Sequence, residues 1–182
     1  MATPERVLTD EMVEAIKALF PRYPTRQAVT LPALHIVNER LRYVPIAAVV
    51  EIARLLDLAP AEVQDTLSFY GFFKQDAPHG RTRAWVCRSI SCALRGGEEV
   101  LEHMCHTLGV KPGETTKDGR VTLEFGECLG ACDFAPCMLA GKTLYKDLTI
   151  EKADAWMSSL STAEAGGQVE GPDVGVRGGQ ER

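Results

Sequence analysis

Two closely spaced pairs of cysteines constrain how this chain can fold more than any other feature. Cys87 and Cys92 are separated by four residues, and Cys128 and Cys132 by three. Each pair is close enough in sequence to bind one metal centre, whereas only a folded domain can bring the two pairs together. Four converging thiolates are the ligand set of iron–sulfur clusters and of structural zinc.

The spacing within the pairs favours an iron–sulfur cluster over zinc. Structural zinc often binds knuckles with a two-residue gap, and neither pair has one. A [2Fe–2S] cluster is larger than a single ion and takes two cysteines on each iron, so wider gaps suit it. Gly126 and Gly130 lie beside and within the second pair, where glycine lets the backbone approach a cluster closely. Zinc and disulfide bonds stay open as alternatives at this point.

The remaining cysteines and the arginines beside the first pair are less informative. Cys105 falls on the apolar face of a predicted helix, so we expect it to pack in the core. Cys137 follows a proline in a predicted strand. We expect it to pack in the core or beside the cluster, with an alternative ligand or a disulfide partner as the other possibility. Arg88 and Arg95 either offset the charge of a thiolate cluster or are simply solvated.

Composition and charge exclude several functions. The formal net charge of −5 argues against nucleic acid as a partner, because phosphate binding needs a basic surface. No segment reaches the roughly 18 apolar residues of a membrane span, so direct membrane insertion is not expected. The N-terminus lacks the apolar segment of a secretory signal. We therefore expect a cytoplasmic protein, in which clustered cysteines favour metal binding over a disulfide framework.

The first part of the chain predicts four short amphipathic helices. Apolar residues recur there at helical spacing, as at Val49, Ile52 and Leu56. The helices are expected at about residues 10–20, at about 32–42, after Pro45 and from Pro60. Four short helices with short turns indicate a small helical bundle.

The second part predicts a mixture of strands and helices. Polar Thr122 and Glu124 alternate with apolar neighbours, which predicts a half-buried strand. The order of elements indicates an α/β layer sandwich. Strands are expected at Arg83–Cys87, around 121–125 and in a hairpin that turns at Gly141-Lys142, and helices at Glu98–Leu108 and from Thr149 to about Leu160.

These patterns predict an α+β chain in three parts. Residues 1–76 form the helical domain, and residues 77–160 form the domain that carries the cysteine pairs. Residues 161–182 are rich in glycine and poor in apolar side chains, so we expect a disordered tail.

Several segments together resemble one known family. The first cysteine pair is followed by Gly96-Gly97, and the segment 111–119 contains Gly-Glu-Thr-Thr and Asp-Gly. The second pair stands in Glu-Cys-Leu-Gly-Ala-Cys, followed by Ala135-Pro136. With a helical lead-in that ends in Ser-Phe-Tyr, the chain resembles the 24 kDa-type [2Fe–2S] subunit of NADH:quinone oxidoreductase, respiratory complex I, over about residues 8–160.

The resemblance implies a thioredoxin-like ferredoxin domain behind the helical bundle. It implies one [2Fe–2S] cluster, whose ligands would be Cys87, Cys92, Cys128 and Cys132. It also implies docking on a partner subunit that binds FMN and NADH. The cluster would exchange single electrons with that flavin, so the chain would be a non-catalytic electron-transfer subunit. Through its complex, it would lie at the inner face of the plasma membrane.

Other functions stay open beside this one. Similar subunits serve NAD-linked hydrogenases and formate dehydrogenases, and the motifs do not separate these from complex I. A zinc-stabilised interaction module is a further alternative. The sequence has no phosphate-binding loop and no dinucleotide-binding fingerprint, so FMN and NAD are expected on the partner. Cys137 departs from the family pattern, in which an aliphatic residue or Met is more usual.

Overall fold

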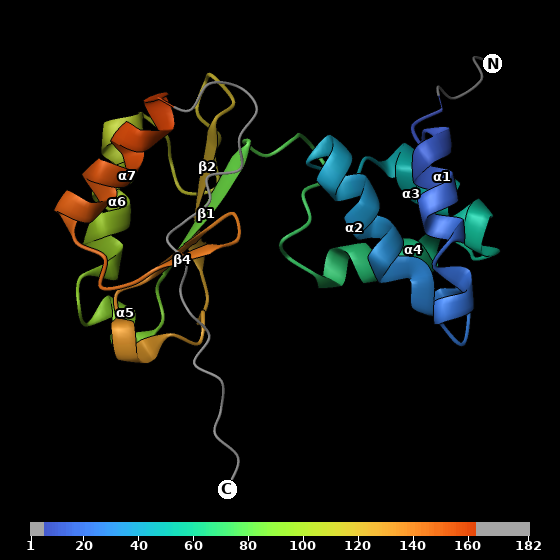
Figure 1. Cartoon of the computed structure of the whole chain (residues 1–182), viewed down its shortest axis with the longest axis horizontal. Helices are drawn as coiled ribbons and strands as arrows, with labels where there is room; N and C mark the ends of the chain where they lie inside the picture. The colour runs from blue at the N-terminus through green and yellow to red at the C-terminus, as the bar shows by residue number, and fades with distance from the viewer. Residues whose placement is uncertain (1–5, 163–182) are drawn as a thin grey trace, which may run out of the picture. The chain divides into compact units, whose positions relative to one another are not determined.

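The computed structural model describes residues 6–162 of the 182-residue chain. Its contacts divide the chain into two compact units, Met1–His79 and Gly80–Arg182 (Figure 1). The first unit is helical and the second combines helices with a sheet, which confirms the predicted α+β fold class. The three-part domain division stays a prediction, and most of the expected tail lies outside the described residues. Within the described residues, no helix is both long and apolar enough to cross a membrane.

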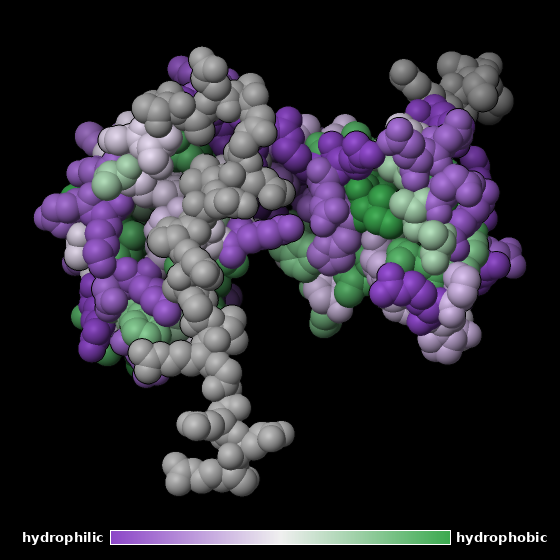
Figure 2. All heavy atoms as spheres, in the orientation of Figure 1, coloured by the Kyte–Doolittle hydropathy of each residue, from purple (hydrophilic) through white to green (hydrophobic). Residues whose placement is uncertain are grey.

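Four α-helices build the first unit around one apolar core. The side chains of Ile16, Leu34 and Ile52 are completely buried in this core. On the face shown in Figure 2, apolar side chains lie between the helices and hydrophilic ones cover much of the surface. The helices are α1 (Asp10–Lys17), α2 (Thr30–Leu41), α3 (Ile46–Leu56) and α4 (Pro60–Phe69), with 3₁₀ turns at Phe20–Arg22 and Gln27–Val29.

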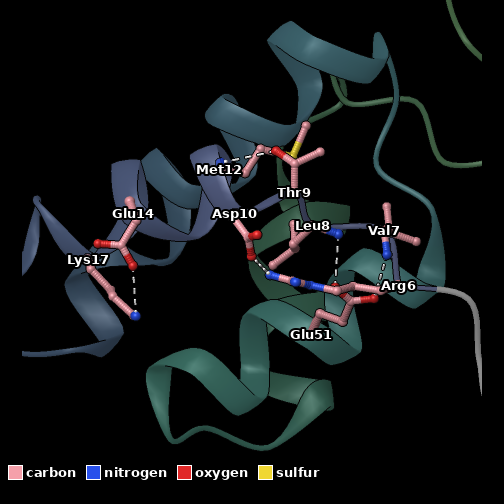
Figure 3. A network of polar contacts seen from close by, with 9 residues as sticks. All are labelled: Arg6, Val7, Leu8, Thr9, Asp10, Met12, Glu14, Lys17 and Glu51. Carbon is pink, nitrogen blue, oxygen red and sulfur yellow. Dashed lines mark hydrogen bonds and ion pairs between the residues drawn. The ribbon is translucent and has the colours of Figure 1, made fainter.

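A carboxylate on α3 fixes the segment that leads into α1. The two carboxylate oxygens of Glu51 accept hydrogen bonds from the backbone N–H groups of Val7 and Leu8, at 2.8 and 2.9 Å (Figure 3). Leu8 is buried in the helical core. Thr9 then caps α1, because its hydroxyl accepts a hydrogen bond from the backbone N–H of Met12 at 3.3 Å. Glu51 therefore links the start of the chain to the third helix.

Replacing Glu51 with alanine tests this link. Hydrogen bonds to charged groups contribute about 1.5–3 kcal/mol each, so we expect Glu51→Ala to lower the free energy of unfolding by about 2 kcal/mol. Glu14→Ala is the matched control, because it removes an exposed ion pair with Lys17 that contributes about 0.5 kcal/mol. Urea unfolding of the full chain measures both, and equal losses in the two variants would contradict the role of Glu51.

The second unit is built on a four-stranded mixed sheet in the order β2-β1-β3-β4. Strand β1 pairs in parallel with β2 and antiparallel with β3, which in turn pairs antiparallel with β4. Helix α6 (Gly97–Leu108) lies in the connection from β1 to β2, as a parallel pair requires. The strands are β1 (Thr82–Cys87), β2 (Val121–Gly126), β3 (Met138–Ala140) and β4 (Thr143–Tyr145).

Helices α6 and α7 (Ile150–Thr162) pack side by side over one face of the sheet (Figure 1). Their apolar faces and the strands bury a second core, which contains Val86, Leu101 and Leu123. Cys105 is also buried in this core, with 7% of its surface exposed, so the prediction for this cysteine is confirmed.

The prediction that the strand around residues 121–125 is half-buried is wrong. Thr122 and Glu124 are also buried, with 1% and 8% of their surface exposed. Thr122 accepts a hydrogen bond from the backbone N–H of Gly80 at 2.6 Å, and Glu124 forms a buried ion pair with Arg83 of β1. Because these polar groups have partners, the second face of the strand can be polar and still exclude water.

Candidate metal centre

The parallel pairing of β1 and β2 brings the two cysteine pairs to one edge of the sheet. Cys87 is the last residue of β1, and its register partner Gly126 is the last residue of β2. The loops that carry the remaining cysteines therefore begin side by side. The backbone N–H of Arg88 donates to the carbonyl of Gly126 at 3.0 Å, which joins the starts of the two loops.

Three cysteines form the inner half of the site. Cys92 lies in the short helix α5 (Ile90–Ala93), and Cys137 directly precedes β3. The sulfur atoms of Cys87, Cys92 and Cys137 all lie within 4.8 Å of one another, and all three residues are buried. The sulfurs of Cys92 and Cys137 are 3.8 Å apart. Cys137 is therefore buried against two of the predicted ligands, which confirms the expectation that it packs in the core or beside them.

The outer half of the site contains Cys128 and Cys132, which are both exposed. Their sulfur atoms are 3.9 Å apart. Cys132 begins a 3₁₀ turn, η3 (Cys132–Phe134). Gly130 between them has φ = 74°, and its backbone N–H lies 3.4 Å from the sulfur of Cys128. Glycine adopts this left-handed conformation at little cost, so it allows the loop to direct an amide at the sulfur.

Contacts between the two loops bring the halves together. Burial opposes ionisation of Cys87, but hydrogen bonds from the backbone amides of Ser89 and Leu129 outweigh it and lower the pKa of this thiol. The Cys128 thiol raises the pKa of Cys132, and a hydrogen bond from the Ser91 hydroxyl opposes this rise. Each loop therefore supplies a donor to a cysteine of the other loop. Ser89 and Ser91 were not predicted as site residues, although two hydroxyls between a pair of cysteines are a sequence signal for hydrogen-bond donors to the thiols.

The other two inner thiols are harder to ionise. Burial and the neighbouring Cys87 thiol raise the pKa of Cys92. Burial, together with the adjacent Cys92 thiol, raises the pKa of Cys137 to about 12. Low-dielectric surroundings disfavour a second thiolate next to a first one. A bound cation would reverse this effect, because it stabilises the thiolates that coordinate it.

The spacing of the sulfur atoms fits two metal ions better than one. Two thiolates on one tetrahedral ion lie roughly 3.8 Å apart, since metal–sulfur bonds are about 2.3 Å long. The outer pair has this spacing, and the inner pair lies within 4.8 Å. A single zinc ion would need all four sulfur atoms at that spacing from one another. Among the described residues, however, no group of ligand atoms that lie within 4.8 Å of one another includes both cysteine pairs. The donor set therefore suits a two-iron cluster, with one pair of thiolates on each iron.

The arginines beside the first pair are both held by protein groups. The guanidinium of Arg88 pairs with the carboxylate of Glu127 at 2.6 Å, so much of its charge is already neutralised. Arg95 donates a hydrogen bond to the carbonyl of Ala135 at 3.3 Å. Arg95 therefore helps to position the segment that leads to Cys137.

Comparisons with known proteins agree with this chemistry. Residues 16–161 match the family described as thioredoxin-like [2Fe–2S] ferredoxin. The chain is 38% identical to an NADH-quinone oxidoreductase subunit of Rhizobium meliloti (strain 1021), over 87% of this chain and 94% of that protein. It is 32% identical to an NADH-quinone oxidoreductase subunit of Thermus thermophilus, over 90% of this chain and 91% of that protein.

Solved structures show a similar architecture. The NAD⁺-reducing [NiFe]-hydrogenase in the H₂-reduced state matches with a TM-score of 0.64 and 26% identity, over 73% of this chain but only 22% of the hydrogenase chain. Its air-oxidised form matches with a TM-score of 0.58 and 21% identity, which supports the fold alone. The family match confirms the predicted thioredoxin-like fold and the predicted [2Fe–2S] cofactor. The chain belongs to the thioredoxin-like [2Fe–2S] ferredoxin family.

Proposed function

We propose that this chain is an electron-transfer subunit of an NADH:quinone oxidoreductase. It would exchange single electrons between its [2Fe–2S] cluster and the FMN of an NADH-oxidising partner subunit. The observation that carries the proposal is the convergence of two cysteine pairs at one edge of the sheet. The likeness to NADH-quinone oxidoreductase subunits, over nine-tenths of their length, supports the assignment to this class of complex.

In this proposal, the inner cysteines Cys87 and Cys92 hold one iron, and the outer cysteines Cys128 and Cys132 hold the other. When bound, the cluster supplies one-electron chemistry at a potential that depends on its ligands, hydrogen bonds and exposure. The amides of Leu129 and Gly130 approach the sulfurs of Cys87 and Cys128, respectively. Hydrogen bonds to thiolate sulfur stabilise negative charge there, so these amides favour the reduced state.

The two halves of the site differ in their access to a partner. The inner cysteines are buried, whereas Cys128 and Cys132 are exposed. We therefore expect the flavin-bearing subunit to approach the outer pair, because a redox partner must come close to the cluster. The complex would also hold the chain at the inner face of the membrane. The chain itself would bind neither NADH nor quinone and would be non-catalytic.

A second candidate is the equivalent subunit of an NAD-linked hydrogenase or formate dehydrogenase. The similarity to a chain of the NAD⁺-reducing hydrogenase, at a TM-score of 0.64, favours this candidate. Purification of the chain from its native source, followed by identification of the co-purifying subunits, distinguishes these assemblies. A membrane-bound quinone reductase supports the first candidate, and a nickel–iron or a formate-oxidising subunit supports the second.

The cluster content of purified protein tests the proposed chemistry. Protein isolated without oxygen should be brown and contain about two irons and two acid-labile sulfides per chain. Cys128→Ala and Cys132→Ala should each abolish this content, because each removes a proposed ligand. Cys105→Ala, which removes a buried thiol in the other core of the same unit, should retain it. Stoichiometric zinc in a colourless wild-type protein would refute the electron-carrier function.

Gly97 provides a separate test of how the inner half is positioned. A Cβ atom at Gly97 would lie 2.9 Å from the carbonyl oxygens of both Cys87 and Cys92, so α6 can begin here only without a side chain. We expect Gly97→Ala to displace this backbone and to lower the iron and sulfide content of the folded protein. Gly109→Ala, at the other end of α6, meets open space at φ = 66° and should cost about 1 kcal/mol of stability without loss of cluster. Wild-type iron content in Gly97→Ala would contradict this role.

A further inference from the structure

We propose that Cys137 is a reserve ligand of the cluster. It can take the place of Cys87 or Cys92 on the inner iron, whereas the described part of the chain offers no third cysteine of this kind beside the outer pair. The inference rests on the proposed ligand set and adds a fifth cysteine to it. Cys137 is not required when Cys87 and Cys92 are both present.

The sulfur positions carry this inference. Cys87, Cys92 and Cys137 form one group, with every sulfur within 4.8 Å of the other two. The distance of 3.8 Å between the sulfurs of Cys92 and Cys137 equals the spacing of roughly 3.8 Å that two thiolates on one tetrahedral ion require. It also matches the 3.9 Å that separates the outer pair. Cys137 can therefore pair with a remaining inner cysteine with little change in its own position.

The backbone around Cys137 keeps its sulfur in this place. The backbone N–H of Cys87 donates to the carbonyl of Cys137 at 3.0 Å, which continues the pairing of β1 with β3. The carbonyl of the preceding Pro136 accepts a hydrogen bond from the backbone N–H of Leu148 at 2.8 Å. Cys87, Cys92 and Cys137 are at most 2% exposed. When one of the three thiols is removed, the metal ligand nearest to the inner iron is therefore another thiol rather than bulk water.

The outer pair differs from the inner trio in its number of cysteines and in its exposure. Cys128 and Cys132 contact each other and are exposed. Among the described residues, the inner trio is the only group of three potential ligands of this kind. Cys105 is a buried residue of α6 and belongs to a different cluster of buried residues. Loss of Cys128 or Cys132 would thus leave one iron of the proposed cluster with a single cysteine ligand.

A set of alanine variants of the full chain, purified and reconstituted without oxygen, tests the inference. C137A is prepared alone, and C87A, C92A and C128A are each prepared alone, with C137A, and with C105A as the matched control for loss of a buried thiol. Iron and sulfide content, the visible circular dichroism of the oxidised protein and the EPR spectrum of the reduced protein are measured. We expect C87A and C92A to retain most of the cluster, with shifted spectra that report a changed ligand. Addition of C137A should then lower their content to that of C128A, whereas addition of C105A should not.

Several results would overturn the reserve role. C87A and C92A would lose the cluster as completely as C128A if Cys137 could not bind iron. Complete loss in C137A alone would instead make Cys137 one of the four primary ligands. Far-UV circular dichroism checks folding, and C87S and C92S replace any alanine variant that fails to fold. Failure of the proposed function is distinguishable, because wild-type protein would then contain no iron and no sulfide.

Discussion

The parallel pairing of β1 with β2 is the constraint on which the metal centre depends. In a parallel pair both strands end at the same edge, so Cys87 and Gly126 finish in register and two loops leave from one place. A connection through α6 makes this pairing possible, and α6 and α7 together bury the core that holds the strands in place. The cysteines that we propose as metal ligands are far apart in the sequence, and the parallel pairing of the two strands makes them neighbours.

The two loops are also held by contacts with each other, such as the ion pair between Arg88 and Glu127. The amide of Leu129, in the second loop, stabilises the thiolate of Cys87, and the hydroxyl of Ser91, in the first, reaches Cys132. Gly97, the first residue of α6, packs against the backbone carbonyls of Cys87 and Cys92 with no room for a side chain. Such contacts would hold the proposed ligands near their binding positions before metal arrives, and so reduce the ordering that metal binding must bring about.

Much of this architecture follows from the sequence, and the exceptions have physical causes. Long periodic segments such as α3 and α6 were predictable, as were β1 and the cysteine pairs, because spacing alone defines them. Helix α5, at four residues, is too short to show a period. The burial of Glu124 depends on Arg83, a partner 41 positions away. The contact of Cys92 with Cys137 depends on the antiparallel pairing of β3 with β1, and no pattern within a single segment specifies which strands become neighbours.

The difference in exposure between the two halves of the site affects how a bound cluster would degrade. Oxidants and chelators in solution can reach Cys128 and Cys132 directly, whereas the three inner thiols are buried. In the proposed cluster, degradation should thus begin at the iron that Cys128 and Cys132 would hold. A docked protein that covers the outer cysteines would slow this decay, so the lifetime of the centre would depend on assembly as well as on the chain's own fold.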